Sequence, residues 1–274
     1  MIQLSMNELT TMRWSLEEDI EEFSQAGFDG VGIWRQKLSD VGEDLATDLL
    51  AKKGLKCSNL LWAGGFTGSD GISFRDSVVD AVEAIRSAGR LGADCLVIYS
   101  GAWGGHTRTH AQRLVQNALR ELLPFAEEFG VALSLEPMHP GCGADWTFLE
   151  TPREVLELID PLENPFLKIA IDAYHVGFEC LEDESQLDYL AEIANRVGIV
   201  HLGDGYESPD GEQNRCPLGK GCLPIDSIIK TLVGAGYDGF FDVELIGESV
   251  EQIDYPTLIQ QSRDYLGERF AATG

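Results

Sequence analysis

The stretch VALSLEPMHP, residues 131–140, shows the unit from which this chain is built. Residues 109–130 before it carry apolar side chains at three- and four-residue spacing and end in a glycine. This pattern predicts a helix, a glycine turn and then a short buried strand. The strand ends in Glu136, and Pro137 restricts the backbone of that glutamate to an extended conformation, which fixes the direction of its carboxylate.

The same unit recurs along the whole chain. Helical patterns, such as those at 15–30, 74–93 and 225–239, alternate with short apolar runs. The runs predict eight strands, at residues 2–6, 30–34, 56–62, 94–99, 131–136, 167–172, 198–203 and 240–245. This alternation is typical of a parallel sheet, and eight strands favour a (β/α)8 TIM barrel, a single domain over residues 1–274. A doubly wound open sheet is the alternative, but its G-x-G-x-x-G fingerprint after the first strand is missing.

The charge balance of the chain excludes several classes of partner. Its 274 residues include 46 acidic and 20 basic ones, for a net charge of −26. Such a surface repels phosphate backbones and anionic membranes, so we expect neither nucleic acid nor a membrane as partner. The sequence shows no signal peptide and no apolar run of membrane-spanning length, which predicts a cytoplasmic protein with reduced thiols. Cys216 and Cys222 lie close together and are either plain loop thiols or a ligand or redox pair.

Side-chain alternation predicts a cluster of polar groups at one end of the barrel. The large aliphatic residues of each strand suit the layer between barrel and helices, so residues of the other parity must point inward. By this parity four inward residues stand at the carboxyl ends of successive strands: Glu136, Asp172, His201 and Glu244. Barrel enzymes carry their active sites at that rim.

Three carboxylates cannot crowd a buried pocket unless they become protonated or a cation lies among them. Three acids and one imidazole suit one divalent ion, with Mn²⁺, Mg²⁺ or Co²⁺ favoured over Zn²⁺. A single acid at a strand end is more often a helix cap or a solvated loop residue. The common parity and position of all four residues favour the metal site.

Four phrases of the sequence resemble the xylose isomerase-like TIM-barrel superfamily, in particular its sugar phosphate isomerases and epimerases. They are LSLEPMHP, IAIDAYHVG, VHLGDG and RCPLGKGCLPIDSIIKTLVGAGYDGFFDVELIGE. The resemblance implies a (β/α)8 barrel, often dimeric or tetrameric. It implies that Glu136, Asp172, His201 and Glu244 bind the metal, and that Glu136 and Glu244 also remove and return a proton. It further implies that His175 and Arg215 bind substrate oxygens, although the loop from Asp204 to Arg215 is longer than in many members.

These observations predict a metal-dependent isomerase or epimerase of a small, unphosphorylated keto sugar or polyol. The reaction would be proton transfer through a metal-stabilised enediolate. We also expect Trp103 to line the substrate pocket and His139 to contact substrate. The alternatives are a dehydratase of a keto-inositol-like substrate at the same site and a non-catalytic sugar-binding barrel. The charge and the small number of histidines argue against an endonuclease of the same superfamily.

Overall fold

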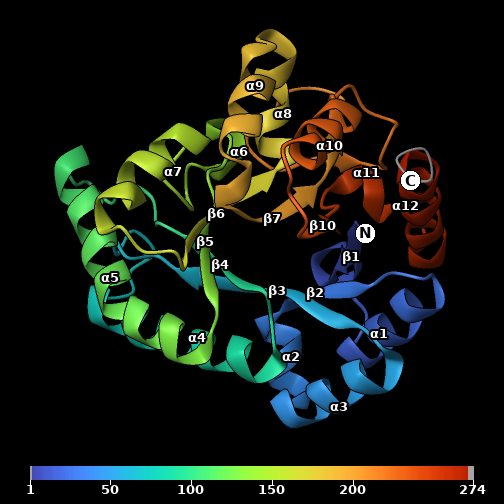
Figure 1. Cartoon of the computed structure of the whole chain (residues 1–274), viewed down its shortest axis with the longest axis horizontal. Helices are drawn as coiled ribbons and strands as arrows, with labels where there is room; N and C mark the ends of the chain where they lie inside the picture. Colours follow the sequence, from blue (N-terminus) through green and yellow to red (C-terminus); the bar gives the residue numbers. More distant parts are fainter. Residues whose placement is uncertain (1, 271–274) are drawn as a thin grey trace.

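A closed barrel of parallel strands forms the centre of the protein (Figure 1). The computed structural model describes residues 2–270. The barrel strands follow the order β1-β10-β7-β6-β5-β4-β3-β2, and β1 pairs with both β2 and β10 to close the ring. Their bounds are β1 Gln3–Asn7, β2 Gly30–Trp34, β3 Lys56–Gly64, β4 Cys95–Tyr99, β5 Ala132–Leu135, β6 Leu167–Asp172, β7 Val197–Leu202 and β10 Phe240–Val243. The predicted barrel and its eight strands are therefore confirmed.

Helices surround this barrel (Figure 1). The helix α1 begins at the predicted capping signature, where Ser15 and Glu18 cap each other's backbone. Several helices end at a glycine in the left-handed conformation, for example Gly92 and Gly130. The helices are α1 Leu16–Gln25, α2 Arg35–Val41, α3 Glu43–Lys53, α4 Phe74–Leu91, α5 Arg108–Phe129, α6 Pro140–Gly143, α7 Pro152–Ile159, α8 Ala173–Glu182, α9 Ser185–Glu192, α10 Ile225–Gly234, α11 Glu248–Glu251 and α12 Tyr255–Phe270, with short 3-10 turns at Glu8–Thr11, Asp160–Leu162 and Ala194–Arg196.

Two separate apolar cores confirm the predicted side-chain parity. The large core lies between strands and helices and takes the outward residues of each strand, such as Leu133 and Leu135 of β5. The small core contains Val97, Ala170 and Phe240, which belong to the opposite parity on three different strands. The barrel interior is thus a packed layer, and the inward positions above it at the carboxyl end remain for polar side chains.

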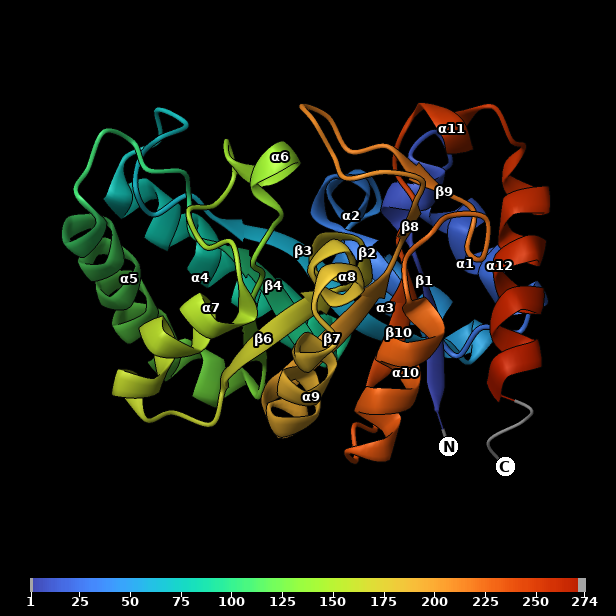
Figure 2. The same ribbon diagram turned by 90° about the horizontal axis from the view of Figure 1, so that it is seen from above.

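The loops at the carboxyl ends of the strands include a long connection that follows β7. A two-stranded ribbon, β8 Asp204–Gly205 and β9 Arg215–Cys216, closes this connection at its base. The connection appears at the top of Figure 2, on the same side as α6 and α11. The sequence analysis predicted a long loop here but not the ribbon. Among residues 2–270, none of the helices combines the length and the apolar character that crossing a membrane requires.

Candidate active site

The four predicted metal ligands lie together at the carboxyl ends of adjacent strands. Asp172 is the last residue of β6, and His201 pairs with it in register on β7. Glu136 and Glu244 follow directly after β5 and β10. All four side chains are buried. Strand geometry alone therefore brings side chains that are distant in sequence to one point.

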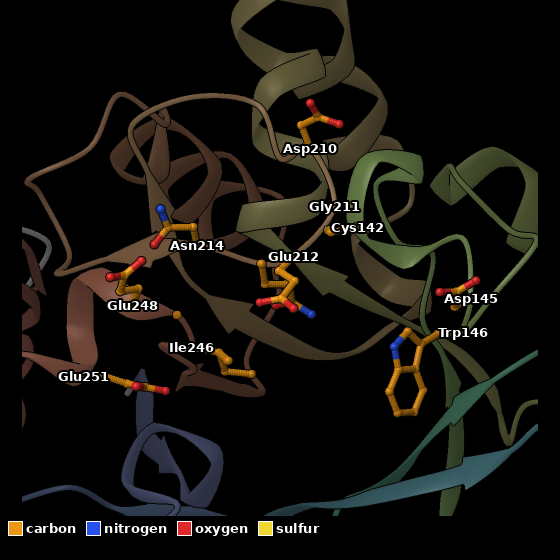
Figure 3. A pocket seen from close by; sticks show the side chains of 12 residues that line it. Cys142, Asp145, Trp146, Asp210, Gly211, Glu212, Asn214, Ile246, Glu248 and Glu251 are labelled. Atoms are coloured by element: carbon orange, nitrogen blue, oxygen red, sulfur yellow. The ribbon is translucent and has the colours of Figure 1, made fainter.

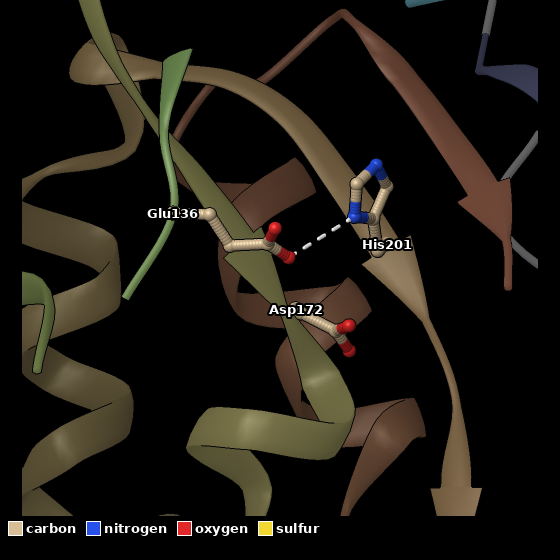
Figure 4. Close-up of side chains that lie close together, drawn as sticks. All are labelled: Glu136, Asp172 and His201. Atoms are coloured by element: carbon tan, nitrogen blue, oxygen red, sulfur yellow. Dashed lines mark hydrogen bonds and ion pairs between the residues drawn. The ribbon is translucent and has the colours of Figure 1, made fainter. Parts of the chain in front are cut away.

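Glu136, Asp172 and His201 lie close enough together to hold a single ion, and Glu244 lies next to His201. His201 Nδ1 lies 3.4 Å from Glu136 Oε1 and 3.3 Å from Glu244 Oε2. Glu136, Asp172 and His201 each offer a ligand atom within 4.8 Å of the others, and Figure 4 shows the three side chains pointing toward one another. A metal ion that bound at the centre of this group would reach oxygen and nitrogen donors from several strands.

Arg215 reaches the same cluster from the ribbon strand β9. Its Nη2 lies 2.8 Å from Asp172 Oδ2 and 3.0 Å from Glu244 Oε1, and its Nη1 donates to the Glu244 carbonyl oxygen at 2.9 Å. The guanidinium group also lies over the ring of Tyr174, with its carbon 4.9 Å from the ring centre. The long loop therefore does not displace Arg215 from the site, despite the departure from the usual loop length.

The carboxylates of the cluster outnumber the guanidinium groups that contact them. Glu136, Asp172 and Glu244 supply three carboxylates, whereas Arg215 is the one guanidinium group in contact with them among the described residues. The excess of carboxylates over guanidinium matches the charge of one divalent cation. The donor set of three carboxylates and one imidazole thus fits a divalent ion in both chemistry and charge.

The buried environment changes the pKa values of these groups in opposite directions. Burial by itself would lower the pKa of His201, but Glu244 and Glu136 outweigh it and raise that pKa to about 10. Burial raises the pKa of Glu244 to about 7, against the opposing charges of Arg215 and His201. For Asp172 the effect of burial is outweighed by Arg215 and the two nearby histidines, so its pKa is lowered. The carboxylates around His201 therefore favour its protonated form in the absence of an ion.

A fourth acid, Asp242 of β10, lies one inward position before Glu244 and contacts His201. Its carboxylate accepts hydrogen bonds from Ser5 Oγ at 2.5 Å, Asn7 Nδ2 at 2.7 Å and Asn59 Nδ2 at 2.9 Å. His201 Nε2 lies 3.8 Å from Asp242 Oδ2 and has no hydrogen-bond partner among the described residues. Asp242 has the same strand parity as Glu244, two residues later, and was not among the predicted site residues.

The predicted substrate-binding residues occupy different positions around the cluster. His175 on α8 is buried beside it, with Nε2 3.9 Å from Asp172 Oδ2 and Nδ1 3.8 Å from Cys142 Sγ. His139 caps α6 and makes a 3.2 Å contact with Ser208 Oγ of the long loop, so it lies at the mouth. Trp103 is 39% exposed and packs on Phe148, with ring centres 4.9 Å apart. The substrate contacts expected of these residues remain predictions.

A cleft of about 680 Å³ opens beside the cluster (Figure 3). Its lining includes Cys142, which contacts His175, and Gln213, which contacts Arg215. Trp146 lines this cleft, and Trp103 is not part of the lining. Among residues 2–270, the lining contains no lysine, arginine or histidine. It contains five acidic residues: Asp145, Asp210, Glu212, Glu248 and Glu251.

Sequence reasoning missed most of these cleft residues. Several of them come from the loop between β8 and β9, which had been noted only for its length. That unusual length was the one available signal, because an insertion next to a predicted active-site rim often forms part of the substrate pocket.

The protein is a TIM barrel with a cluster of buried carboxylates and one imidazole at the carboxyl ends of its strands. Residues 20–269 match the family described as xylose isomerase-like TIM barrel, and the chain belongs to this family. This finding confirms the resemblance seen in the sequence.

Individual relatives include several sugar isomerases and epimerases. The chain is 27% identical to the ketose 3-epimerase of Arthrobacter globiformis, over 88% of this chain and 81% of that protein. It is 23% identical to the inosose isomerase of Halalkalibacterium halodurans, over 96% of this chain and 94% of that protein.

Solved structures show the same fold. A protein of Sinorhizobium meliloti 1021 superposes with a TM-score of 0.87 at 25% identity and covers 97% of both chains. The IOLI protein, solved with a bound zinc atom, superposes with a TM-score of 0.84 at 19% identity and covers 99% of both chains.

Proposed function

We propose that this protein is a divalent-metal-dependent isomerase or epimerase of a small keto sugar or polyol. The observation that carries the proposal is the position of two glutamates around one centre. Glu136 and Glu244 come from strands separated by β6 and β7, yet both carboxylates lie within 3.4 Å of the same nitrogen of His201. Two bases held on either side of a bound carbon are what an epimerisation needs.

The residues of the cluster would bind the ion, transfer the proton and orient the substrate. Glu136, Asp172, His201 and Glu244 would hold the ion, which supplies stabilisation for the negative charge that develops on a substrate oxygen. One of the two glutamates would take the proton from the carbon next to the carbonyl, and the other would return a proton to the opposite face. Arg215 and His175 would orient substrate oxygens beside the cluster.

The donor set supports Mn²⁺ as the ion. Three carboxylate oxygens and one imidazole nitrogen suit Mn²⁺ or Mg²⁺, and imidazole shifts the preference toward Mn²⁺. The similar IOLI protein was solved with a bound zinc atom, which supports testing divalent ions with this chain. Mn²⁺ is therefore the first ion to supply in an assay.

The cleft supports a substrate without a phosphate group. A phosphate dianion would lie among the five acidic side chains of the cleft and would find no cationic side chain in its lining. The relatives that act on a ketose and on an inosose, as their names state, suggest unphosphorylated ketoses and keto-inositols as the first compounds to screen.

Deuterium exchange tests this proposal. The purified protein with Mn²⁺ in D2O would be incubated with a panel of ketoses and keto-inositols, and the products would be analysed by mass spectrometry and NMR. We expect incorporation of one deuterium at a carbon next to the carbonyl, together with an epimer or isomer. Glu136→Gln and Glu244→Gln should each abolish turnover. Loss of water without an isomeric product would assign the dehydratase alternative, and binding without any exchange would assign a sugar-binding barrel.

A further inference from the structure

Gln213 contacts two nitrogens of the Arg215 guanidinium group, and one of them also contacts the carboxylates of the cluster. Its Oε1 accepts from Arg215 Nε at 3.0 Å and from Arg215 Nη2 at 2.7 Å. The arginine side chain is only 1% exposed, so the N–H groups on this edge cannot turn to water instead. Within residues 2–270, Arg215 Nε donates to Gln213 alone, whereas Gln213, Asp172 and Glu244 all contact Nη2.

The loop that carries Gln213 is fixed at several points. At its base, Arg215 N donates to Ile246 O at 2.9 Å, and Asn214 N donates to Tyr174 Oη at 3.1 Å. Near its tip, Gly211 N donates to Gly141 O at 2.7 Å. These bonds leave the loop little freedom to withdraw Gln213 from Arg215.

The amide group of Gln213 can take only one orientation next to Arg215. Because both partner atoms on Arg215 are donors, the oxygen must face the guanidinium group. The amide nitrogen donates no hydrogen bond to any residue within 2–270. Gln213 also lines the cleft, as do its chain neighbours Glu212 and Asn214, which are labelled in Figure 3. The side chain therefore connects the cleft wall to the carboxylate cluster.

We propose that Gln213 is a positioning residue of the reaction, which acts by fixing Arg215 between Asp172 and Glu244. This inference rests on the proposed function, in which Arg215 orients a substrate oxygen. An arginine held on one edge only could rotate about its last bonds, and small displacements of an orienting group reduce rates strongly. The loop between β8 and β9 would thus contribute to the reaction through Gln213.

Two near-isosteric substitutions separate this role from simple packing. Gln213→Met keeps the length and shape of the side chain but removes the acceptor oxygen. Gln213→Glu keeps an acceptor oxygen for Arg215, but it replaces the amide donor by a second acceptor oxygen and adds a negative charge. A residue that merely fills space would tolerate methionine as well as glutamate. Glu207→Gln is the matched control, because Glu207 is an exposed residue of the same loop.

The first readout does not depend on activity. In protein labelled with [15N]arginine, the Nε–H signal of Arg215 can be assigned by its loss in Arg215→Lys. We expect slow hydrogen exchange of this group in the wild type, Gln213→Glu and Glu207→Gln, and exchange at least about tenfold faster in Gln213→Met. Equal protection in Gln213→Met and the wild type would overturn the proposal, even if the wild type catalysed no reaction on any sugar.

The second readout is turnover of whichever substrate the exchange screen identifies. We expect kcat/KM to fall about tenfold to a hundredfold in Gln213→Met, to fall less in Gln213→Glu, and to stay within about threefold of the wild type in Glu207→Gln. Faster exchange in Gln213→Met with unchanged kcat/KM would refute the role in the reaction while leaving the proposed function intact. A wild type without activity would instead refute the proposed function.

Discussion

Replacement of Arg215 by methionine tests whether this arginine compensates the buried carboxylates. The substitution removes a guanidinium group that is 1% exposed and lies 2.8 Å from Asp172 and 3.0 Å from Glu244. Removal of one partner of a buried ion pair costs about 3–5 kcal/mol, because the remaining charge has neither water nor a counter-ion. Without added metal, we therefore expect Arg215→Met to lower the free energy of unfolding by that amount.

The chain offers a matched control in an exposed arginine–aspartate pair. Arg196 Nη1 lies 2.7 Å from Asp160 Oδ1, but the two side chains are 32% and 54% exposed. Such a pair contributes less than about 1 kcal/mol, so Arg196→Met should change stability little. The contact distances of the two pairs are nearly equal, whereas Arg215 is buried and also contacts Glu244.

Urea unfolding followed by circular dichroism, with chelator present, measures both variants against the wild type. A repeat with Mn²⁺ should recover part of the loss in Arg215→Met, because an ion would supply the missing positive charge. The reasoning would be refuted if Arg215→Met and Arg196→Met lost the same small amount of stability. Near-UV circular dichroism would show whether the variant keeps its native packing.

Three further predictions concern other parts of the molecule. Burial, followed by the charge of Asp19, raises the pKa of Glu8 from 4.5 to about 8. Between these two pH values the folded state holds a proton that the unfolded state has lost, so the free energy of unfolding should fall by roughly 1.4 kcal/mol per pH unit. Glu8→Gln should flatten this pH dependence in urea titrations. An unchanged pH dependence in the variant would contradict the assignment to Glu8. A Cβ at Gly32 would lie no more than 3.0 Å from Asp242, whereas one at Gly234 would meet nothing within 4 Å. Gly32→Ala should therefore destabilise by about 1–3 kcal/mol, Gly234→Ala should not, and equal thermal shifts would count against this view. Finally, a ketose should show at least about tenfold higher kcat/KM than its phosphate ester at low salt, with a smaller gap at high salt; a preference for the ester would disprove the argument from the acidic cleft.

Alternation along strands is a local property, which is why the sequence could predict the barrel and the cluster at its rim. The identity of Glu136, Asp172 and His201 as neighbours follows from parity and from the parallel pairing of successive strands. The two cores of the structure follow the same rule, with Leu133 outside the barrel and Ala170 inside it.

Loop contacts depend on residues distant in sequence, and here the sequence predicted less. Gln213 makes its contact because the ribbon and the bond from Asn214 to Tyr174 turn the loop inward, and no local pattern encodes that turn. The sequence analysis chose Trp103 as the residue that lines the substrate pocket, although Trp146 also follows a strand end. The structure places Trp146 on the cleft and packs Trp103 on Phe148.

The most direct test of the central claim is the divalent-metal content of the purified chain, prepared without chelator, exposed to Mn²⁺ and dialysed. Elemental analysis should find about one ion per wild-type chain, and the content should fall close to zero in Glu136→Ala and Glu244→Ala. Glu207→Gln should retain the ion. Failure of the wild type to hold any divalent ion, or retention of the ion by both alanine variants, would contradict the site built from Glu136, Asp172, His201 and Glu244.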